Sequence, residues 1–129
     1  MMPNPNSQPP QNIKLHRKSK VLELIYANDS VNLTCEYLRV HSPSAEVKGH
    51  GEGQEVLQHG KMNVNINAIK PVGNYALLLQ FDDGHETGIY SWDYFQELGA
   101  NYTPYWEAYL SKLAAAGLSR EPNTQVLSL

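Results

Sequence analysis

Apolar and polar residues alternate in short runs through the first third of the chain. Alternation with a period of two is typical of a β-strand that has one face in the core and one in water. The basic turn Arg17–Ser19 separates the first two runs, and the turn-forming cluster Asn28–Ser30 separates the second from the third. The pattern therefore predicts three short strands, at Ile13–His16, Val21–Tyr26 and Val31–Leu33.

A short helix is predicted after the third strand. The hydroxyl of Thr34 can accept a free backbone N–H and so cap a helix over Cys35–Val40. Ser42 precedes a proline, and the residue before proline avoids the helical region, so the helix should end there. The next stretch, Ala45–Gly60, is polar and glycine-rich, and we predict a long loop.

Strand-like segments return in the second half of the chain. Val64–Ile69 alternates, whereas Tyr75–Phe81 is apolar except for Gln80, as expected of a strand that is buried on both faces. Pro71–Asn74 is predicted to be the turn between them. The Asp-Gly pair within Asp82–His85 is a strong hairpin signal, and it predicts a returning strand at Glu86–Tyr90.

Two helices complete the pattern. Ser91 is a natural N-cap for a helix over Trp92–Leu98, which Gly99 should end. Thr103, followed by a proline, marks the start of the last helix, and Gly117 marks its end. One face of that helix is apolar: Trp106, Tyr109, Leu110 and Leu113. The elements together predict an α+β fold, with a mainly antiparallel β-sheet of five or six short strands, a short helix after the third strand and two C-terminal helices.

Length and composition fit one small domain. The chain has 129 residues, of which 41% are hydrophobic, so a real core is possible. We predict a disordered tail at 1–12, a single domain at 13–118 and a second disordered tail at 119–129. No segment has the apolar length of a membrane span or the apolar centre of a signal peptide. With Cys35 as the only cysteine, we expect a cytoplasmic protein in a reducing compartment.

Charge is unevenly distributed along the chain. The formal net charge of −3 argues against a nucleic-acid partner that is bound through bulk charge. Basic residues gather in Lys14–Lys20, whereas no Lys or Arg lies between Lys70 and Lys112, where six acidic residues occur. The ordinary explanation is solvated faces of opposite sign. The alternative is a partner surface whose field steers association.

Two blocks of sequence resemble a known family. The first block is Glu36–Val47, and the second runs from Ile69–Tyr75 through Phe81–His85 to Thr87–Trp92. Both resemble the stand-alone bacterial domain DUF971, which is similar to the N-terminal domain of gamma-butyrobetaine hydroxylase. The likeness extends over residues 13–113, and it supports the single domain predicted from composition.

The resemblance also implies a metal position. In the hydroxylase the equivalent domain binds zinc through a Cys-Pro-Cys-x-x-Cys segment and a distant histidine in an Asp-Gly-His turn. Carried over residue by residue, the three cysteine positions fall on Ser42, Ser44 and Val47, and the histidine falls on His85. Structural zinc needs four strong donors, usually thiolates and imidazoles, which serine and valine do not supply. We therefore expect no zinc at these positions and no cofactor.

A second metal arrangement stays open. His50 and Glu52 could join His85 to imitate the two-histidine, one-carboxylate set of non-haem iron oxygenases. The chain would then bind iron or zinc, or form part of a 2-oxoglutarate-dependent hydroxylase-like system. Against this, the pair lies in a glycine-rich loop that cannot hold it rigidly. Cys35 could be a nucleophile at a helix start, although a lone cysteine is more often a small buried hydrophobe.

The function favoured over an enzymatic one is a non-catalytic binding domain that acts through protein–protein contacts. The family resemblance implies an accessory role in iron–sulfur cluster assembly, because the domain also occurs fused to P-loop ATPases that carry such clusters. Such an ATPase scaffold is the expected partner. We expect no nucleic-acid or membrane partner and, by default, a monomer. The expected partner-binding surface combines acidic and aromatic residues with one arginine: Arg39, Asp82, Asp83, His85, Glu86, Tyr90, Trp92, Asp93 and Tyr94.

Overall fold

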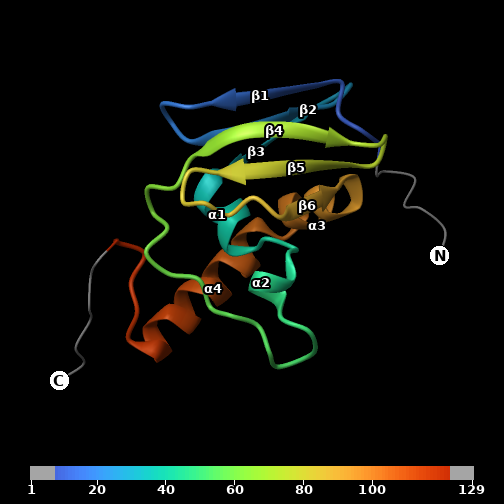
Figure 1. Cartoon of the computed structure of the whole chain (residues 1–129). Coiled ribbons are helices and arrows are strands. Elements are labelled where there is room, and N and C mark those ends of the chain that lie inside the picture. The colour runs from blue at the N-terminus through green and yellow to red at the C-terminus, as the bar shows by residue number, and fades with distance from the viewer. Residues whose placement is uncertain (1–7, 123–129) are drawn as a thin grey trace.

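The computed structural model describes residues 8–122, and the predicted α+β class is confirmed (Figure 1). The six strands of these residues divide into two antiparallel three-stranded sheets, a division that the sequence pattern did not predict. One sheet has the order β1 (Asn12–His16), β2 (Val21–Ile25) and β3 (Ser30–Thr34). The other has the order β4 (Ile66–Val72), β5 (Ala76–Phe81) and β6 (Gly88–Ser91).

Four helices accompany the two sheets in the described chain. They are α1 (Cys35–Val40), α2 (Ala45–Lys48), α3 (Trp92–Ala100) and α4 (Tyr102–Ala116). The strands lie together on one side of the molecule and the helices on the other (Figure 1). Within residues 8–122, no helix has the length and apolar character that crossing a membrane requires.

The core lies where the inner faces of the two sheets meet α1 and α3. Alternate residues of each sheet point inward, such as Leu22 and Leu24 of β2 and Leu77 and Leu79 of β5. Burying each such leucine favours folding by about 1.5–3 kcal/mol. Every residue of α1 is buried, so this short helix is held by packing rather than by its own propensity.

Two buried tyrosines tie the helices to the core. The Tyr37 hydroxyl donates to the carbonyl of Leu98, and the Tyr90 hydroxyl donates to the carbonyl of Leu38. Each bond satisfies a phenol that would otherwise be buried without a partner, which would cost about 1–3 kcal/mol. α1 therefore hydrogen-bonds to α3 through Tyr37 and to β6 through Tyr90.

Residues 119–122 belong with the folded domain rather than with the disordered tail expected at 119–129. The backbone N–H groups of Gly60 and Met62 donate to the carbonyls of Ser119 and Arg120. The Arg120 guanidinium also makes two hydrogen bonds to the buried carboxylate of Glu36, at 2.9 and 2.7 Å. The rest of that predicted tail, and residues 1–7 of the N-terminal one, lie outside the described residues.

The predicted loop at Ala45–Gly60 is wrong for its first four residues, which form α2. Ser44 caps this helix by accepting the N–H of Glu46. The predicted turn at Pro71–Asn74 is also wrong for its first two residues, because β4 continues to Val72. Proline has no N–H for a sheet ladder, and it is tolerated here because β4 is an edge strand.

The two C-terminal helices differ from the prediction at their shared boundary. α3 continues through Gly99 to Ala100, and this glycine lies against β3: a Cβ added there would be 3.0 Å from Val31 Cγ1. α4 begins at Tyr102, one residue before the predicted cap Thr103, with Asn101 as its N-cap residue. The predicted end at Gly117 is confirmed, and its φ of 67° is left-handed.

Candidate functional site

The positions that correspond to the family's zinc ligands lie in two segments that meet in the structure. Ser42 follows α1, Ser44 caps α2, Val47 lies within α2, and His85 lies in the turn between β5 and β6. Ser42 Oγ is 2.8 Å from His85 Nε2. Ser44 Oγ is 2.8 Å from the hydroxyl of Thr87, two residues beyond His85.

His85 is the centre of this group, and both of its ring nitrogens are engaged. Nδ1 is 3.0 Å from a carboxylate oxygen of Glu46, and Nε2 faces Ser42 Oγ. Burial and the nearby Arg39 guanidinium lower the pKa of His85, although Glu46 and Asp83 oppose them. A neutral imidazole then donates from Nδ1 to Glu46 and accepts the Ser42 hydroxyl at Nε2. This donor set does not fit structural zinc, because it offers one imidazole and no thiolate.

The order serine, histidine, carboxylate is also that of a hydrolase triad, so access to the serine decides what the group can do. Ser42 is 0% exposed, and its Oγ also accepts the backbone N–H of Ser44 at 3.3 Å. Gly88 lies so close that a Cβ there would come within 2.6 Å of Ser42 Oγ. No space remains for a substrate carbonyl at this oxygen, and the group serves as a hydrogen-bond network between α2 and the β5–β6 turn.

A second charged group is centred on Asp83, which belongs to the same turn. Asp83 accepts from Arg39 Nε at 2.8 Å and from Lys61 Nζ at 2.6 Å, and its other oxygen accepts the backbone N–H of His85. Burial raises the pKa of Asp83, but these donors outweigh it, so the pKa lies below its usual value. Among the described residues, the buried Arg39 Nη1 has no hydrogen-bond partner. Asp83 is therefore the counterion of a buried guanidinium, one nitrogen of which has no hydrogen-bond partner among the described residues.

The residues predicted to form a partner surface are divided between the interior and the exterior. Arg39, His85 and Tyr90 are buried. Trp92 and Tyr94 are half-buried, and they donate side-chain hydrogen bonds to the carbonyls of Asn74 and His41. The predicted residues that are exposed are Asp82, Asp83, Glu86 and Asp93, although the Asp83 side chain itself is only 20% exposed.

Sequence reasoning missed two exposed apolar side chains beside these carboxylates. Tyr75 is 61% exposed and Ile89 is 48% exposed. In β6, Ile89 pairs with Leu78 whereas the buried Tyr90 pairs with Leu77, so the two neighbours point to opposite faces of the sheet. The period-two alternation of β6 was the signal that could have separated them.

The alternative metal set is not brought together. His50 and Glu52 are exposed in the loop after α2, whereas His85 is buried against Ser42 and Glu46. Among residues 8–122, no group of three or more His, Cys, Asp or Glu side chains is placed to hold a metal ion. Cys35 is buried, and burial raises the pKa of its thiol to about 11, which disfavours the nucleophilic thiolate.

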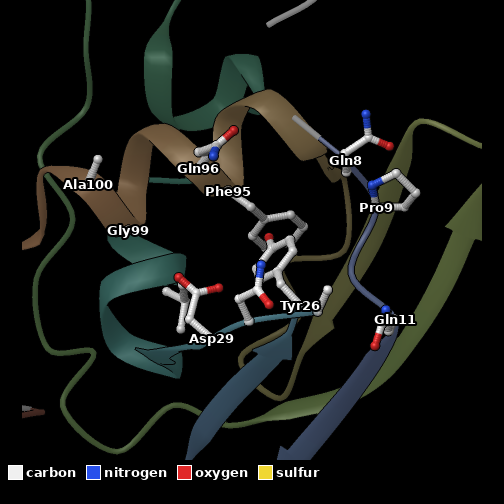
Figure 2. A pocket seen from close by; sticks show the side chains of 12 residues that line it. Gln8, Pro9, Gln11, Tyr26, Asp29, Phe95, Gln96, Gly99 and Ala100 are labelled. Carbon is white, nitrogen blue, oxygen red and sulfur yellow. The ribbon is translucent and has the colours of Figure 1, made fainter. Parts of the chain in front are cut away.

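A cavity of about 830 Å³ lies apart from all of these residues (Figure 2). Its walls are the chain just before β1, the end of β2 with the turn that follows, and one side of α3. The aromatic residues lining it are Tyr26 and Phe95, and Asp29 is its one formally charged lining residue within the described chain. None of the predicted site residues lines this cavity.

Comparisons with known proteins agree with the sequence resemblance. The family described as gamma-butyrobetaine hydroxylase-like, N-terminal, matches residues 13–96. Two solution NMR structures share 51% and 50% identity with the chain, with TM-scores of 0.81 and 0.79. The first match covers 95% of this chain and 97% of the other, and the second covers 100% and 97%. A crystal structure of a DUF971-family protein of unknown function from Acidithiobacillus ferrooxidans shares 36% identity, at a TM-score of 0.57, over 75% of this chain and 98% of that one. No curated protein matches.

Proposed function

The chain belongs to the gamma-butyrobetaine hydroxylase-like N-terminal family, and we propose that it acts as a non-catalytic domain that binds another protein. The observation that carries this proposal is the exposed apolar surface on the outer side of the β4–β5–β6 sheet. We call it the outer sheet face, and it consists of Lys70, Val72, Leu78 and Ile89.

Strand register explains why the outer sheet face is apolar. Lys70, Leu78 and Ile89 are paired across β4, β5 and β6, so they form one row on the face opposite the core. No helix of the described chain lies over this face in Figure 1. An exposed apolar patch beside polar residues is typical of a protein interaction site.

Exposed carboxylates lie at both ends of β6. Glu86 precedes the strand and Asp93 follows it, with Ile89 between them. A partner that offers an apolar centre and basic residues around it would complement this arrangement. Asp83 is less available to such a partner, because it already pairs with Arg39 and Lys61.

The partner that we propose is a P-loop ATPase scaffold of iron–sulfur cluster assembly. Support for this choice comes from the family resemblance, since the same domain occurs fused to ATPases of this kind. This chain would be a monomeric accessory subunit of that scaffold.

A pull-down with matched variants tests the proposal. The immobilised chain is incubated with native lysate at several salt concentrations, and retained proteins are identified by mass spectrometry. We expect an ATPase scaffold to be retained by the parent and by Leu110→Lys, which changes an exposed leucine on α4. Ile89→Lys should reduce retention roughly tenfold or more, as loss of a central apolar anchor does.

Two results would overturn the proposal. One is the absence of any ATPase at every salt concentration. The other is equal retention by Ile89→Lys and the parent, once the NMR spectrum of the variant has shown that it is folded.

A further inference from the structure

An open groove lies on the helical side of the molecule, away from the outer sheet face. Its volume is about 710 Å³, within the range of small-molecule sites. It is bounded by the end of α1 and the residues that follow it, by α2 with part of the loop that follows, and by α3 and α4. We call it the His41 groove, and the lining residues that matter here are His41, Lys48, Tyr94, Tyr105, Tyr109 and Lys112.

His41 provides a hydrogen-bond acceptor in this groove. Its Nδ1 is 2.9 Å from the carbonyl of Tyr37, so Nδ1 carries the proton and donates it. Burial lowers the pKa of His41 and the charges of Lys112 and Lys48 lower it further, although the hydrogen bond to the Tyr37 carbonyl opposes them. The lowered pKa favours the neutral ring. Nε2 is then an acceptor, and no described residue donates to it.

Two ammonium groups lie near this imidazole. Lys48 stands over the Tyr94 ring, with Nζ 4.4 Å from the ring centroid, and Lys112 projects from α4. Neither lysine forms an ion pair with another described residue. The carboxylate of Glu97 also lines the groove, but it accepts the Tyr105 hydroxyl at 2.7 Å. Glu55 is the remaining carboxylate of the lining, and it is exposed on the loop.

The tyrosines supply aromatic surface rather than free hydroxyls. Tyr105 is stacked on His41 with 21° between the ring planes, and Tyr109 meets the imidazole edge-on. All three groove phenols donate to protein acceptors: Tyr94 to His41 O, Tyr105 to Glu97 and Tyr109 to Gln58 O. The two lysines are the cations of the groove and His41 Nε2 is an acceptor without a described donor, so these three groups are available to an anionic ligand.

We propose that the His41 groove binds a small anion with an aromatic ring that carries a hydrogen-bond donor. The aromatic side chains would contact the ring, Lys48 and Lys112 would pair with the anion, and His41 Nε2 would accept the donor. Hydroxyaryl carboxylates and nucleoside monophosphates both present this chemistry. The inference is independent of the proposed function, because the groove and the outer sheet face share no residue.

NMR titration of the isotope-labelled protein tests the proposal. The probes are 4-hydroxybenzoate, benzoate and adenosine monophosphate, with benzyl alcohol and inorganic phosphate as the corresponding neutral ring and bare anion. We expect 4-hydroxybenzoate or the nucleotide to shift the amide resonances of the groove residues. Lys112→Met should weaken that binding about tenfold, as expected for losing a charge-assisted hydrogen bond. Lys70→Met, on the outer sheet face, and Ile89→Lys should leave it unchanged.

His41 has its own test. The parent should prefer 4-hydroxybenzoate to benzoate, and His41→Phe should abolish the preference without abolishing binding of the ring. The proposal fails if neither aromatic anion shifts groove resonances, or if phosphate or benzyl alcohol alone binds equally well. It also fails if Lys112→Met binds the probes as tightly as Lys70→Met does.

Discussion

Replacing Asp83 by asparagine should destabilise the protein far more than a surface charge change does. Asp83 is the ion-pair partner of Arg39, whose side chain is only 8% exposed and whose Nη1 has no hydrogen-bond partner among the described residues. Asp83→Asn would leave that guanidinium buried without a counterion. Lys61, the other partner of Asp83, is more exposed and can turn to water.

The size of the expected loss in the free energy of unfolding follows from how deeply the two side chains are buried. Removing one partner of a fully buried ion pair costs about 3–5 kcal/mol. The Asp83 side chain is 20% exposed, so partial solvation reduces the effect, and we expect about 2–4 kcal/mol. For a chain of this length, that loss should lower Tm by roughly 8–16 °C. A small domain has about 5–15 kcal/mol in total, so the variant should still fold.

Urea unfolding followed by circular dichroism measures this loss, with two further variants as controls. Glu86→Gln removes a charge from the same turn but breaks no ion pair of the described chain, and it should cost less than about 0.5 kcal/mol. Adding Arg39→Met to Asp83→Asn removes the buried charge itself, and it should recover at least half of the loss. The reasoning is refuted if Asp83→Asn equals Glu86→Gln, or if the double variant is no more stable than Asp83→Asn.

Four further outcomes follow from buried groups. Folding lowers the pKa values of His85 and His41. Their contribution to the free energy of unfolding is therefore complete above about pH 6.5 and is lost as pH falls through the folded pKa values. Urea unfolding at a series of pH values should show this loss, and His85→Asn should make stability depend less on pH. Cys35, with a pKa of about 11, should react with iodoacetamide at mild alkaline pH only after urea unfolds the chain, as mass spectrometry would report. Ser42 should not be labelled by a fluorophosphonate probe, and labelling would contradict its burial. Elemental analysis after chelation and desalting should find no stoichiometric zinc, because Ser42 supplies a hydroxyl where a thiolate is needed.

Sequence rules for caps and helix ends correctly predicted the boundaries that neighbouring residues determine. Thr34 and Ser91 cap the helices that their hydroxyls predicted, and Gly117 ends the last helix in the left-handed conformation. The rules failed where a distant residue decides. A glycine is typical of a helix end, yet α3 continues past Gly99, which lies against Val31 of β3, where a Cβ would make a tight contact at 3.0 Å.

Candidate site residues were harder to predict, because their burial also depends on residues that are distant in the sequence. The acidic and aromatic residues near His85 are neighbours in sequence, and that proximity gave no sign of which were buried. Strand alternation sends Ile89 outward and Tyr90 inward. The His41 groove could not be found at all, since its lysines, Lys48 and Lys112, come from helices far apart in the chain and no motif links them.

The contacts around His85 show how the α1–α2 segment and the β5–β6 turn are joined where the hydroxylase domain has zinc. Three side-chain hydrogen bonds, Ser42 to His85, Ser44 to Thr87 and Arg39 to Asp83, each join residues 43 or 44 positions apart. A metal centre would make the whole connection depend on one ion, because losing it removes every bond at once. Separate hydrogen bonds, each with a net contribution of about 1 kcal/mol, fail one at a time. Chelators should therefore leave the Tm of this chain unchanged, and Ser44→Ala should lower the Tm by only a few degrees. Asp83→Asn leaves the buried Arg39 without a counterion, so it should be the most destabilising single change at this junction.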